Sequence, residues 1–172
     1  MAITQKDMDA VVTELVGEDV MPVVKYLKGK KDISEFEIAE KLGLEVNQTR
    51  NMLYRMFGYN IVTYHRKKDR IKGWYISYWT LNPPRIKELV LENQKKKIDV
   101  LNEKLLKETA NQNMFFLCPS LCIRADFDQA TNLGYHCPEC GSLLTQQDNS
   151  KTIENIKRRI EEEQQVYDKL AA

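Results

Sequence analysis

Four cysteines in the C-terminal third of the chain constrain its fold more than any other feature. They are Cys118, Cys122, Cys137 and Cys140, and they follow the spacing C-x3-C-x14-C-x2-C. Thiolates are the structural ligands that zinc prefers, and four of them complete a tetrahedron with no open position. Two closely spaced pairs allow two turns to enclose one ion. The spacing therefore predicts one structural Zn²⁺ held by the four cysteines.

Other roles for these cysteines fit the sequence less well. A redox C-x-x-C motif needs a surrounding βαβ pattern, which this sequence lacks. His136 adjoins Cys137 and would be the substitute ligand if one thiolate did not bind. Disulfides require an oxidising compartment. No apolar run approaches the ~18–20 residues of a membrane span, and residues 1–10 show no apolar core after a basic start, so we expect neither export nor a membrane partner.

The cysteine module, residues 114–148, is too small to fold on a hydrophobic core alone. Pro138 and Gly141 favour a tight turn around its second cysteine pair. Between the two pairs, the segment IRADFDQATNLGYH predicts a short antiparallel pair of strands. Metal binding and folding then form one equilibrium, so removal of zinc is expected to unfold this zinc ribbon.

Positive charge is concentrated in one short segment, although the whole chain carries a net charge of only +1. Residues 59–84 contain one acidic and five basic side chains, whereas residues 118–172 have a net charge of −3. The basic side chains of the first segment are Arg66, Lys67, Lys68, Arg70 and Lys72. The near-neutral total excludes a uniformly basic coat for nucleic acid, so any such contact must be local.

Two short helices separated by a turn precede the basic segment. Ser34 predicts an N-cap, with Glu37 three residues later as in a capping box, and Gly43 ends the first helix. Asn47 is expected to cap the second helix. A short capped helix, a turn and a second helix are the parts of a helix-turn-helix.

The pattern changes to β-strand at Ile61. Residues 61–64 and 74–81 are rich in β-branched and aromatic side chains, and a polar loop that ends in Gly73 separates them. Such runs predict a hairpin, and a helix-turn-helix followed by a hairpin is a winged helix. His65 is expected in the solvated loop.

The hairpin, or wing, combines aromatic rings with the basic loop. Alternation places Trp74, Ile76 and Tyr78 on one face and Tyr75, Ser77 and Trp79 on the other. One face must pack on the helices, so the other exposes rings beside a basic tip. Such a surface suits an acidic protein groove or unpaired bases that stack on the rings. The candidate contact residues of the wing are Tyr64, Arg66, Lys67, Lys68, Arg70, Trp74 and Tyr75.

Two further helices complete a mostly α fold with small β-sheets. The Pro83-Pro84 step ends the last strand and can start a helix. A long helix is predicted from about Pro84 to Asn111, with a narrow apolar stripe typical of a spacer. A last helix begins near Ser150. Its stripe, which could pack on the spacer, dimerise or bind a second subunit, consists of Ile153, Ile156, Ile160, Tyr167 and Leu170. The expected domains are a winged helix-turn-helix at 1–83, a spacer helix at 84–113, the zinc ribbon at 114–148 and a C-terminal helix at 149–172.

The second helix of the helix-turn-helix could read duplex DNA. It carries no acid, and amides and arginines read adenine and guanine. Its polar side chains are Asn47, Gln48, Arg50, Asn51 and Arg55. However, the preceding helix, which should lie near phosphates, carries the acidic residues Glu35, Glu37 and Glu40. One candidate function, kept as the alternative to the one given below, is therefore a sequence-specific DNA-binding regulator with a structural zinc module. We do not expect an enzyme, because four thiolates leave no place for a reactive water.

The order of the modules resembles the large (alpha) subunit of general transcription factor IIE. The short form, without a long acidic tail, is similar to the archaeal version, transcription factor E. The resemblance rests on YRMFGYNIVTYHRKKDRIKGWYISYWTLNPPRI and HCPECGSLL. One difference is that the family has two residues within the first cysteine pair, whereas three separate Cys118 from Cys122.

The resemblance implies a non-catalytic initiation factor that binds the clamp and stalk of RNA polymerase and helps to open promoter DNA and keep it open. It implies a promoter complex with TATA-binding protein and transcription factor B, and a smaller beta-type subunit as a further partner. Of the roles open to the stripe of the last helix, the resemblance favours binding of this subunit. Contact with DNA would be weak and on the non-template strand. The expected location is the archaeal cytoplasm, at the nucleoid, or the nucleus of a eukaryote.

Overall fold

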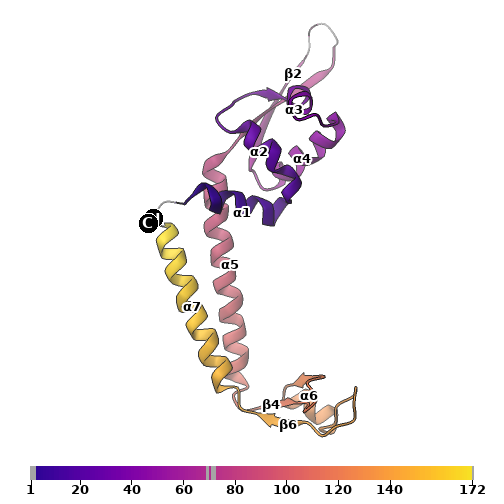
Figure 1. The fold of residues 1–172 in the computed structure, drawn as a ribbon, viewed down its shortest axis with the longest axis vertical. Helices are drawn as coiled ribbons and strands as arrows, with labels where there is room; N and C mark the ends of the chain where they lie inside the picture. Colours follow the sequence, from indigo (N-terminus) through magenta and orange to yellow (C-terminus); the bar gives the residue numbers. More distant parts are fainter. Residues whose placement is uncertain (1–2, 69, 71–72, 172) are drawn as a thin grey trace. The chain divides into compact units, whose positions relative to one another are not determined.

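A computed structural model describes residues 3–68, 70 and 73–171 of the chain (Figure 1). Lys72, counted above among the basic loop residues, lies outside the described part. The chain divides into two compact units. Unit 1 contains residues up to Asn93 together with the last three residues, and unit 2 runs from Gln94 to Lys169. None of the described helices is both long and apolar enough to cross a membrane.

Unit 1 contains the two helices predicted for the helix-turn-helix and three further helical segments before them. They are α1 (Gln5–Val16), the short 3₁₀ helix η1 (Glu18–Val20), α2 (Met21–Leu27), α3 (Glu35–Leu42) and α4 (Val46–Gly58). The Ser34 side chain accepts a hydrogen bond from the Glu37 backbone N–H, and Gly43 ends α3 in the left-handed conformation. The prediction that Asn47 caps α4 is wrong. Glu45 is the N-cap, because its carbonyl already accepts the Thr49 N–H and closes the first turn.

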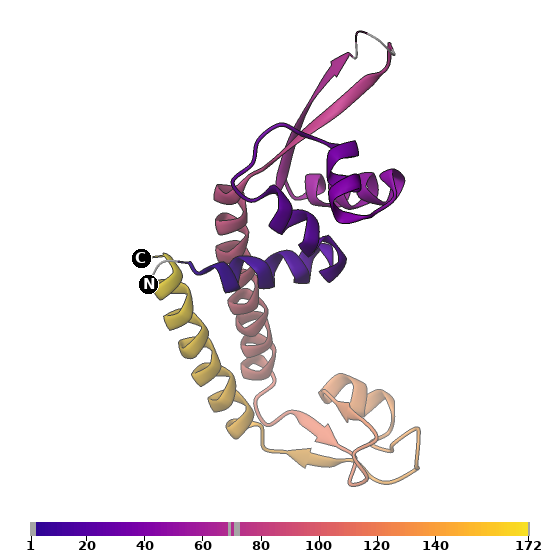
Figure 2. The same ribbon diagram turned by 45° about the horizontal axis from the view of Figure 1, so that its top comes forward.

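A three-stranded antiparallel sheet completes the winged helix. Its strands are β1 (Ile33–Ser34), β2 (Val62–Lys68) and β3 (Tyr75–Leu81), in the order β1-β3-β2. Tyr64 lies opposite Trp79, and His65 lies opposite Tyr78. The hairpin of β2 and β3 extends past α3 and α4 (Figure 2). His65 is therefore a strand residue, contrary to the expected loop position. The reason is that β2 continues beyond residue 64 into the basic segment and ends at Lys68.

Trp79 joins the sheet to the helices. Its side chain is fully buried, and its ring contacts those of Tyr54 and Phe57 on α4 and Tyr64 on β2, with centroid distances of 4.8–6.5 Å. Ser77, on the same face of β3, is also buried. The predicted alternation is thus confirmed, and the Ser77 and Trp79 face is the one that packs on the helices.

A buried carboxylate connects α3 to α4. Glu35 is only 3% exposed, and one of its oxygens accepts hydrogen bonds from Nη2 and Nε of Arg50 at 2.6 and 3.0 Å. This hydrogen bonding raises the pKa of Arg50. A second arginine of α4, Arg55, donates to the Val16 carbonyl and pairs with Asp19. The two partly exposed arginines of α4 therefore connect this helix to α3 and to the end of α1 and η1.

Helix α5 (Pro83–Ala110) follows the sheet, as predicted from the Pro-Pro step. Its first part belongs to unit 1, where Ile86, Leu89 and Val90 join the core. Its second part belongs to unit 2, where Ile98 and Leu101 are buried.

Unit 2 also contains a small sheet and the last helix. The sheet has the order β5-β4-β6, formed by β4 (Phe115–Leu117), β5 (Arg124–Ala125) and β6 (Thr145–Gln147). The predicted strand pair between the two cysteine pairs is wrong. Only β5 forms there, and it pairs with β4, whereas α6 (Phe127–Asn132) follows it, started by a capping box between Asp126 and Gln129.

The terminal helix α7 (Ser150–Ala171) lies beside α5 within unit 2 (Figures 1 and 2). Gln94 of α5 donates to the Glu163 carboxylate at 2.5 Å. Ile153 is buried, and Ile156, Ile160 and Tyr167 are partly buried. Of the three roles that the sequence left open for this stripe, the structure shows packing beside the spacer.

The Arg50–Glu35 pair yields a stability prediction. Arg50→Ala leaves a carboxylate buried without its partner, which costs about 1–3 kcal/mol. Denaturant unfolding should show this loss. Asp19→Ala is the control, because it removes a half-exposed pair that contributes at most about 1 kcal/mol. Equal losses for the two variants would contradict a special role of the buried carboxylate.

Candidate functional site

The four cysteines form one cluster. Their sulfur atoms all lie within 4.8 Å of one another, and Cys118 Sγ is 3.4 Å from Cys140 Sγ. Four ligands on a tetrahedron with metal–sulfur bonds of about 2.3 Å stand about 3.8 Å apart. The cluster thus has the size of a four-thiolate metal site. Cys118 and Cys137 are buried, whereas the other two are exposed.

Backbone turns hold each cysteine pair. In the second pair, the Gly141 N–H donates to the Cys137 carbonyl, and Gly141 has a φ of 71°. In the first pair, the Leu121 N–H donates to the Cys118 carbonyl, and Leu121 has a φ of 60°. A left-handed leucine is uncommon. It accommodates the third residue within the C-x3-C pair, so both pairs still present their sulfur atoms to one centre.

The crowded sulfur atoms affect one another's protonation. Neighbouring Cys140 and Cys118 raise the pKa of the Cys122 thiol to about 12. Hydrogen bonds to Ser142 lower the pKa of the Cys140 thiol to about 6. Cys140 is thus ready to bind as a thiolate at neutral pH, and a cation would favour deprotonation of the other thiols.

His136 stands outside this cluster. Its Nδ1 is 2.7 Å from the Gly134 carbonyl oxygen, and its ring is exposed. Among the described residues, the group with metal-ligand geometry consists of the four cysteines alone. Nothing in the geometry supports histidine as a substitute ligand.

A polar network that the sequence did not reveal connects β5 of the ribbon to α5 and to the start of α7. Arg124 of β5 forms two hydrogen bonds with the Glu108 carboxylate of α5, at 2.6 and 2.9 Å. Asn149, fully buried before α7, donates to the Glu108 carboxylate and carbonyl and accepts the Asn113 N–H. The Arg124 hydrogen bonds, followed by that from Asn149, lower the pKa of Glu108.

The wing residues occupy two different environments. Tyr64 is partly buried and packs on Phe57 and Trp79, so it anchors the wing. Arg66 lies over the Tyr64 ring, with 5.5 Å between the guanidinium and the centroid. The remaining candidates are exposed toward the far end of the hairpin: Lys67, Lys68, Arg70, Trp74 and Tyr75.

The second face of the hairpin holds a smaller cluster. His65 stacks on Tyr78, with a centroid distance of 5.5 Å and an interplanar angle of 13°. Its Nδ1 is 3.4 Å from the Asp32 carboxylate, and Lys67 lies over the Tyr78 ring. Basic and aromatic side chains thus alternate on both faces of the wing.

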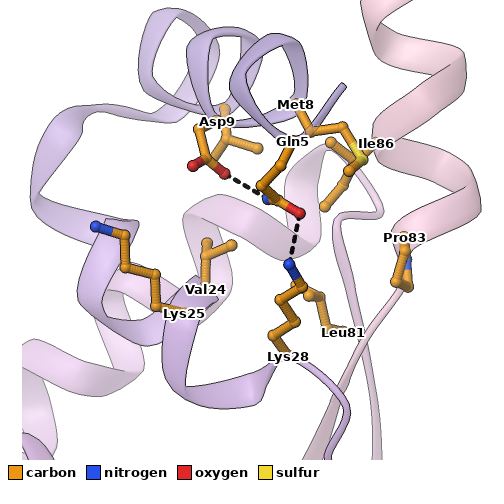
Figure 3. A pocket seen from close by; sticks show the side chains of 10 residues that line it. Gln5, Met8, Asp9, Val24, Lys25, Lys28, Leu81, Pro83 and Ile86 are labelled. Atoms are coloured by element: carbon orange, nitrogen blue, oxygen red, sulfur yellow. Dashed lines mark hydrogen bonds between the residues drawn. The ribbon is translucent and has the colours of Figure 1, made fainter. Parts of the chain in front are cut away.

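A hollow of about 240 Å³ lies between α1, α2, the end of β3 and the start of α5 (Figure 3). Its lining is mainly apolar. Lys28 donates to the Gln5 side chain at 2.7 Å, and Gln5 donates to Asp9 at 2.7 Å. These polar groups therefore satisfy one another, and the lining holds no set of side chains suited to metal binding or nucleophilic attack.

The chain combines a winged helix that carries a basic aromatic wing, a long helix and a four-cysteine module, and helix-turn-helix folds of this kind are typical of DNA-binding and transcription proteins. The family model described as TFIIE alpha subunit matches residues 7–111. A transcription factor E of Metallosphaera sedula is 35% identical and covers 91% of this chain and 87% of its own length. A transcription factor E of Pyrococcus abyssi is 32% identical, over 94% of this chain and 85% of its own.

The chain therefore belongs to the TFIIE alpha subunit family. It is a general transcription factor, as the resemblance of its motifs implied. The family match ends at the end of α5, so the cysteine cluster lies beyond the matched segment.

Loss of one thiolate should open the metal site. For Cys137→Ser we expect a clear fall in bound metal and rapid proteolysis of residues 114–148, since binding and folding are linked. Metal analysis and limited proteolysis measure both effects. The unfolding of unit 1 should not change. Full metal content with unchanged protease resistance would show that the ligand assignment is wrong.

The hydrogen bonds of Glu108 predict that the stability of unit 2 depends on pH. Because the pKa of Glu108 is lowered in the folded protein, its contribution to stability is present above the ordinary glutamate pKa of about 4.3 and is lost as pH falls through the folded value. Glu108→Gln should therefore destabilise unit 2 at neutral pH and flatten this acid-side loss. Chemical unfolding between about pH 7 and pH 3 tests this. If the free energy of unfolding fell with decreasing pH as steeply in the variant as in the unchanged protein, the prediction would be contradicted.

Proposed function

We propose that this chain binds RNA polymerase on its clamp and stalk side and promotes or stabilises promoter opening. Its family supports a general role in transcription initiation. The observation that carries the finer proposal is the wing, where exposed Trp74 and Tyr75 stand beside Lys67, Lys68 and Arg70. Such a surface fits acidic protein grooves and unpaired bases better than a paired duplex.

The proposed mechanism needs no chemical step. A factor that binds the open-clamp complex more tightly than the closed one shifts their equilibrium by its differential affinity. A difference of ~1.4 kcal/mol changes the ratio about tenfold. Two separate contacts, one through the wing and one through the ribbon, would make the binding bivalent.

The cysteine cluster would hold one structural Zn²⁺ through Cys118, Cys122, Cys137 and Cys140. Zinc fits because four thiolates within 4.8 Å match a tetrahedral sulfur site. The ion would stabilise the ribbon, and its four protein ligands would leave no position for a substrate. Its proposed role is therefore to shape a docking module.

Further partners follow from the family. The proposed setting is a promoter complex with TATA-binding protein and transcription factor B, in an archaeal cytoplasm or a eukaryotic nucleus. Contact with DNA would be weak and on the non-template strand. A smaller beta-type subunit would bind near α7, whose outer face carries exposed Val166.

The alternative, a sequence-specific DNA-binding regulator, depends on α4. Arg50 is hydrogen-bonded to buried Glu35, and Arg55 to Val16 and Asp19. Both arginines would have to give up these partners to read guanine, at the cost of unpairing them. Asn47, Gln48 and Asn51 stay on the α4 surface, so duplex selection is the direct test of this alternative.

Charge reversal of the wing tests the proposal. We expect the triple variant Lys67→Glu, Lys68→Glu, Arg70→Glu to form about threefold to tenfold less open complex, because three attractive contacts become repulsive. Permanganate footprinting with archaeal polymerase, TATA-binding protein and transcription factor B measures the opening. A matched control reverses the exposed residues Lys6, Lys25 and Lys41 of the same unit.

Three results would contradict the proposal. The first is unchanged opening by the wing variant, provided that it folds normally. The second is an equal loss in the control, which would indicate a general effect of charge. The third is selection of one duplex sequence by the isolated protein with high affinity, which would favour the DNA-binding regulator.

A further inference from the structure

A basic groove lies between α5 and α7 within unit 2, where the two helices run side by side (Figure 1). Its volume is about 310 Å³. Val100 and Leu101 of α5 form its apolar part. Its rim carries four cationic side chains, Lys96, Lys97, Lys104 and Arg159. None of the wing residues belongs to it.

The positive charge of the groove is not neutralised within the described part of unit 2. Two ion pairs between described residues of this unit join Arg124 to Glu108 and Arg158 to Glu162, and neither involves a rim cation. None of the four rim cations has a described carboxylate within ion-pair distance. The groove has one acid, Glu163, which accepts a hydrogen bond from Gln94. The rim is therefore a local concentration of positive charge within a unit whose net charge is only −1.

The groove also presents apolar surface. Val100 is 50% exposed, although it stands between lysines on the α5 surface, whereas Leu101 beneath it is 8% exposed. A partner that covers Val100 would gain the free energy of apolar burial, about 25 cal/mol per Å². The surface thus offers apolar contact at its centre and cations around it.

We propose that this groove binds an acidic, amphipathic segment of another protein. Carboxylates of the segment would pair with Lys96, Lys97, Lys104 and Arg159, and one apolar side chain would lie on Val100. Electrostatic complementarity selects the partner, and the apolar contact orients it.

Nucleic acid fits the groove less well. Its phosphates could bind the four cations, but single strands gain much of their affinity from bases stacked on aromatic rings. No aromatic side chain lines the groove. The exposed valine would contribute little to a phosphate contact. The combination of cations with an aliphatic centre therefore favours a peptide.

Fluorescence polarisation with the full-length protein tests the proposal. The probe is a labelled peptide of about 15 residues, rich in Asp and Glu, with leucine at helical spacing. We expect saturable binding that weakens with salt. The double variant Lys97→Glu, Lys104→Glu should lose affinity at least about tenfold, and Val100→Ser should lose about threefold.

Matched control variants distinguish binding in the groove from a general effect of charge on the same helices. Lys95 and Arg158 are exposed on the same two helices but do not line the groove, so Lys95→Glu with Arg158→Glu should change affinity less than about twofold. A second probe replaces each leucine by serine and keeps the charge. It should bind more weakly than the first, by about the factor lost in Val100→Ser.

Four results would overturn the proposal. They are no saturable binding, equal losses in the groove and control variants, equal binding of the leucine and serine peptides, and stronger competition by single-stranded DNA than by the unlabelled peptide. The last result would assign the groove to nucleic acid. A fifth result would also overturn it: self-association of the protein that the double variant abolishes would assign the groove to a second copy of this chain. Promoter opening is not the readout, so these results are independent of the proposed function of the wing.

Discussion

The contact of Trp79 with the rings of α4 holds the wing in place. Tyr54, Phe57 and Tyr64 surround this fully buried indole, and three of the four ring pairs meet edge to face. Its N–H has no hydrogen-bond partner among the described residues, a cost that the ring contacts and the buried area must offset. Because β3 is fixed at Trp79, the hairpin can extend beyond the helices and keep a defined direction. The exposed basic and aromatic residues depend on this anchor.

Local signals in the sequence predicted most of the fold. Ser34 and Gly43 delimit α3, the Pro-Pro step starts α5, and the cysteine spacing brings four sulfur atoms together. Two local signals were read incorrectly or missed. Glu45, rather than Asn47, caps α4, and the Asp126–Gln129 capping box that starts α6 was present in the sequence.

Long-range polar contacts were beyond prediction from the sequence. Glu108 and Asn149 are 41 residues apart, and nothing in the pattern around either indicates that they meet. From the sequence, Glu35 is expected to be an exposed acidic residue in the first turn of α3. In the structure it is buried, because Arg50 pairs with its carboxylate. Such pairs depend on how elements pack, whereas caps and metal-ligand spacing depend on a few neighbouring residues. The seven wing candidates illustrate the same limit, since Tyr64 proved to be an anchor while the others lie exposed.

The positions of the two tryptophans have a practical consequence. Trp79 is fully buried, whereas Trp74 is 52% exposed near the far end of the hairpin. Their fluorescence should therefore separate by environment, with blue-shifted emission from the buried ring and red-shifted, quencher-accessible emission from the other. A Trp79→Phe chain would emit from the wing alone, and a Trp74→Phe chain from the core alone. The protein thus contains one intrinsic reporter for occupancy of the wing and another for integrity of the fold.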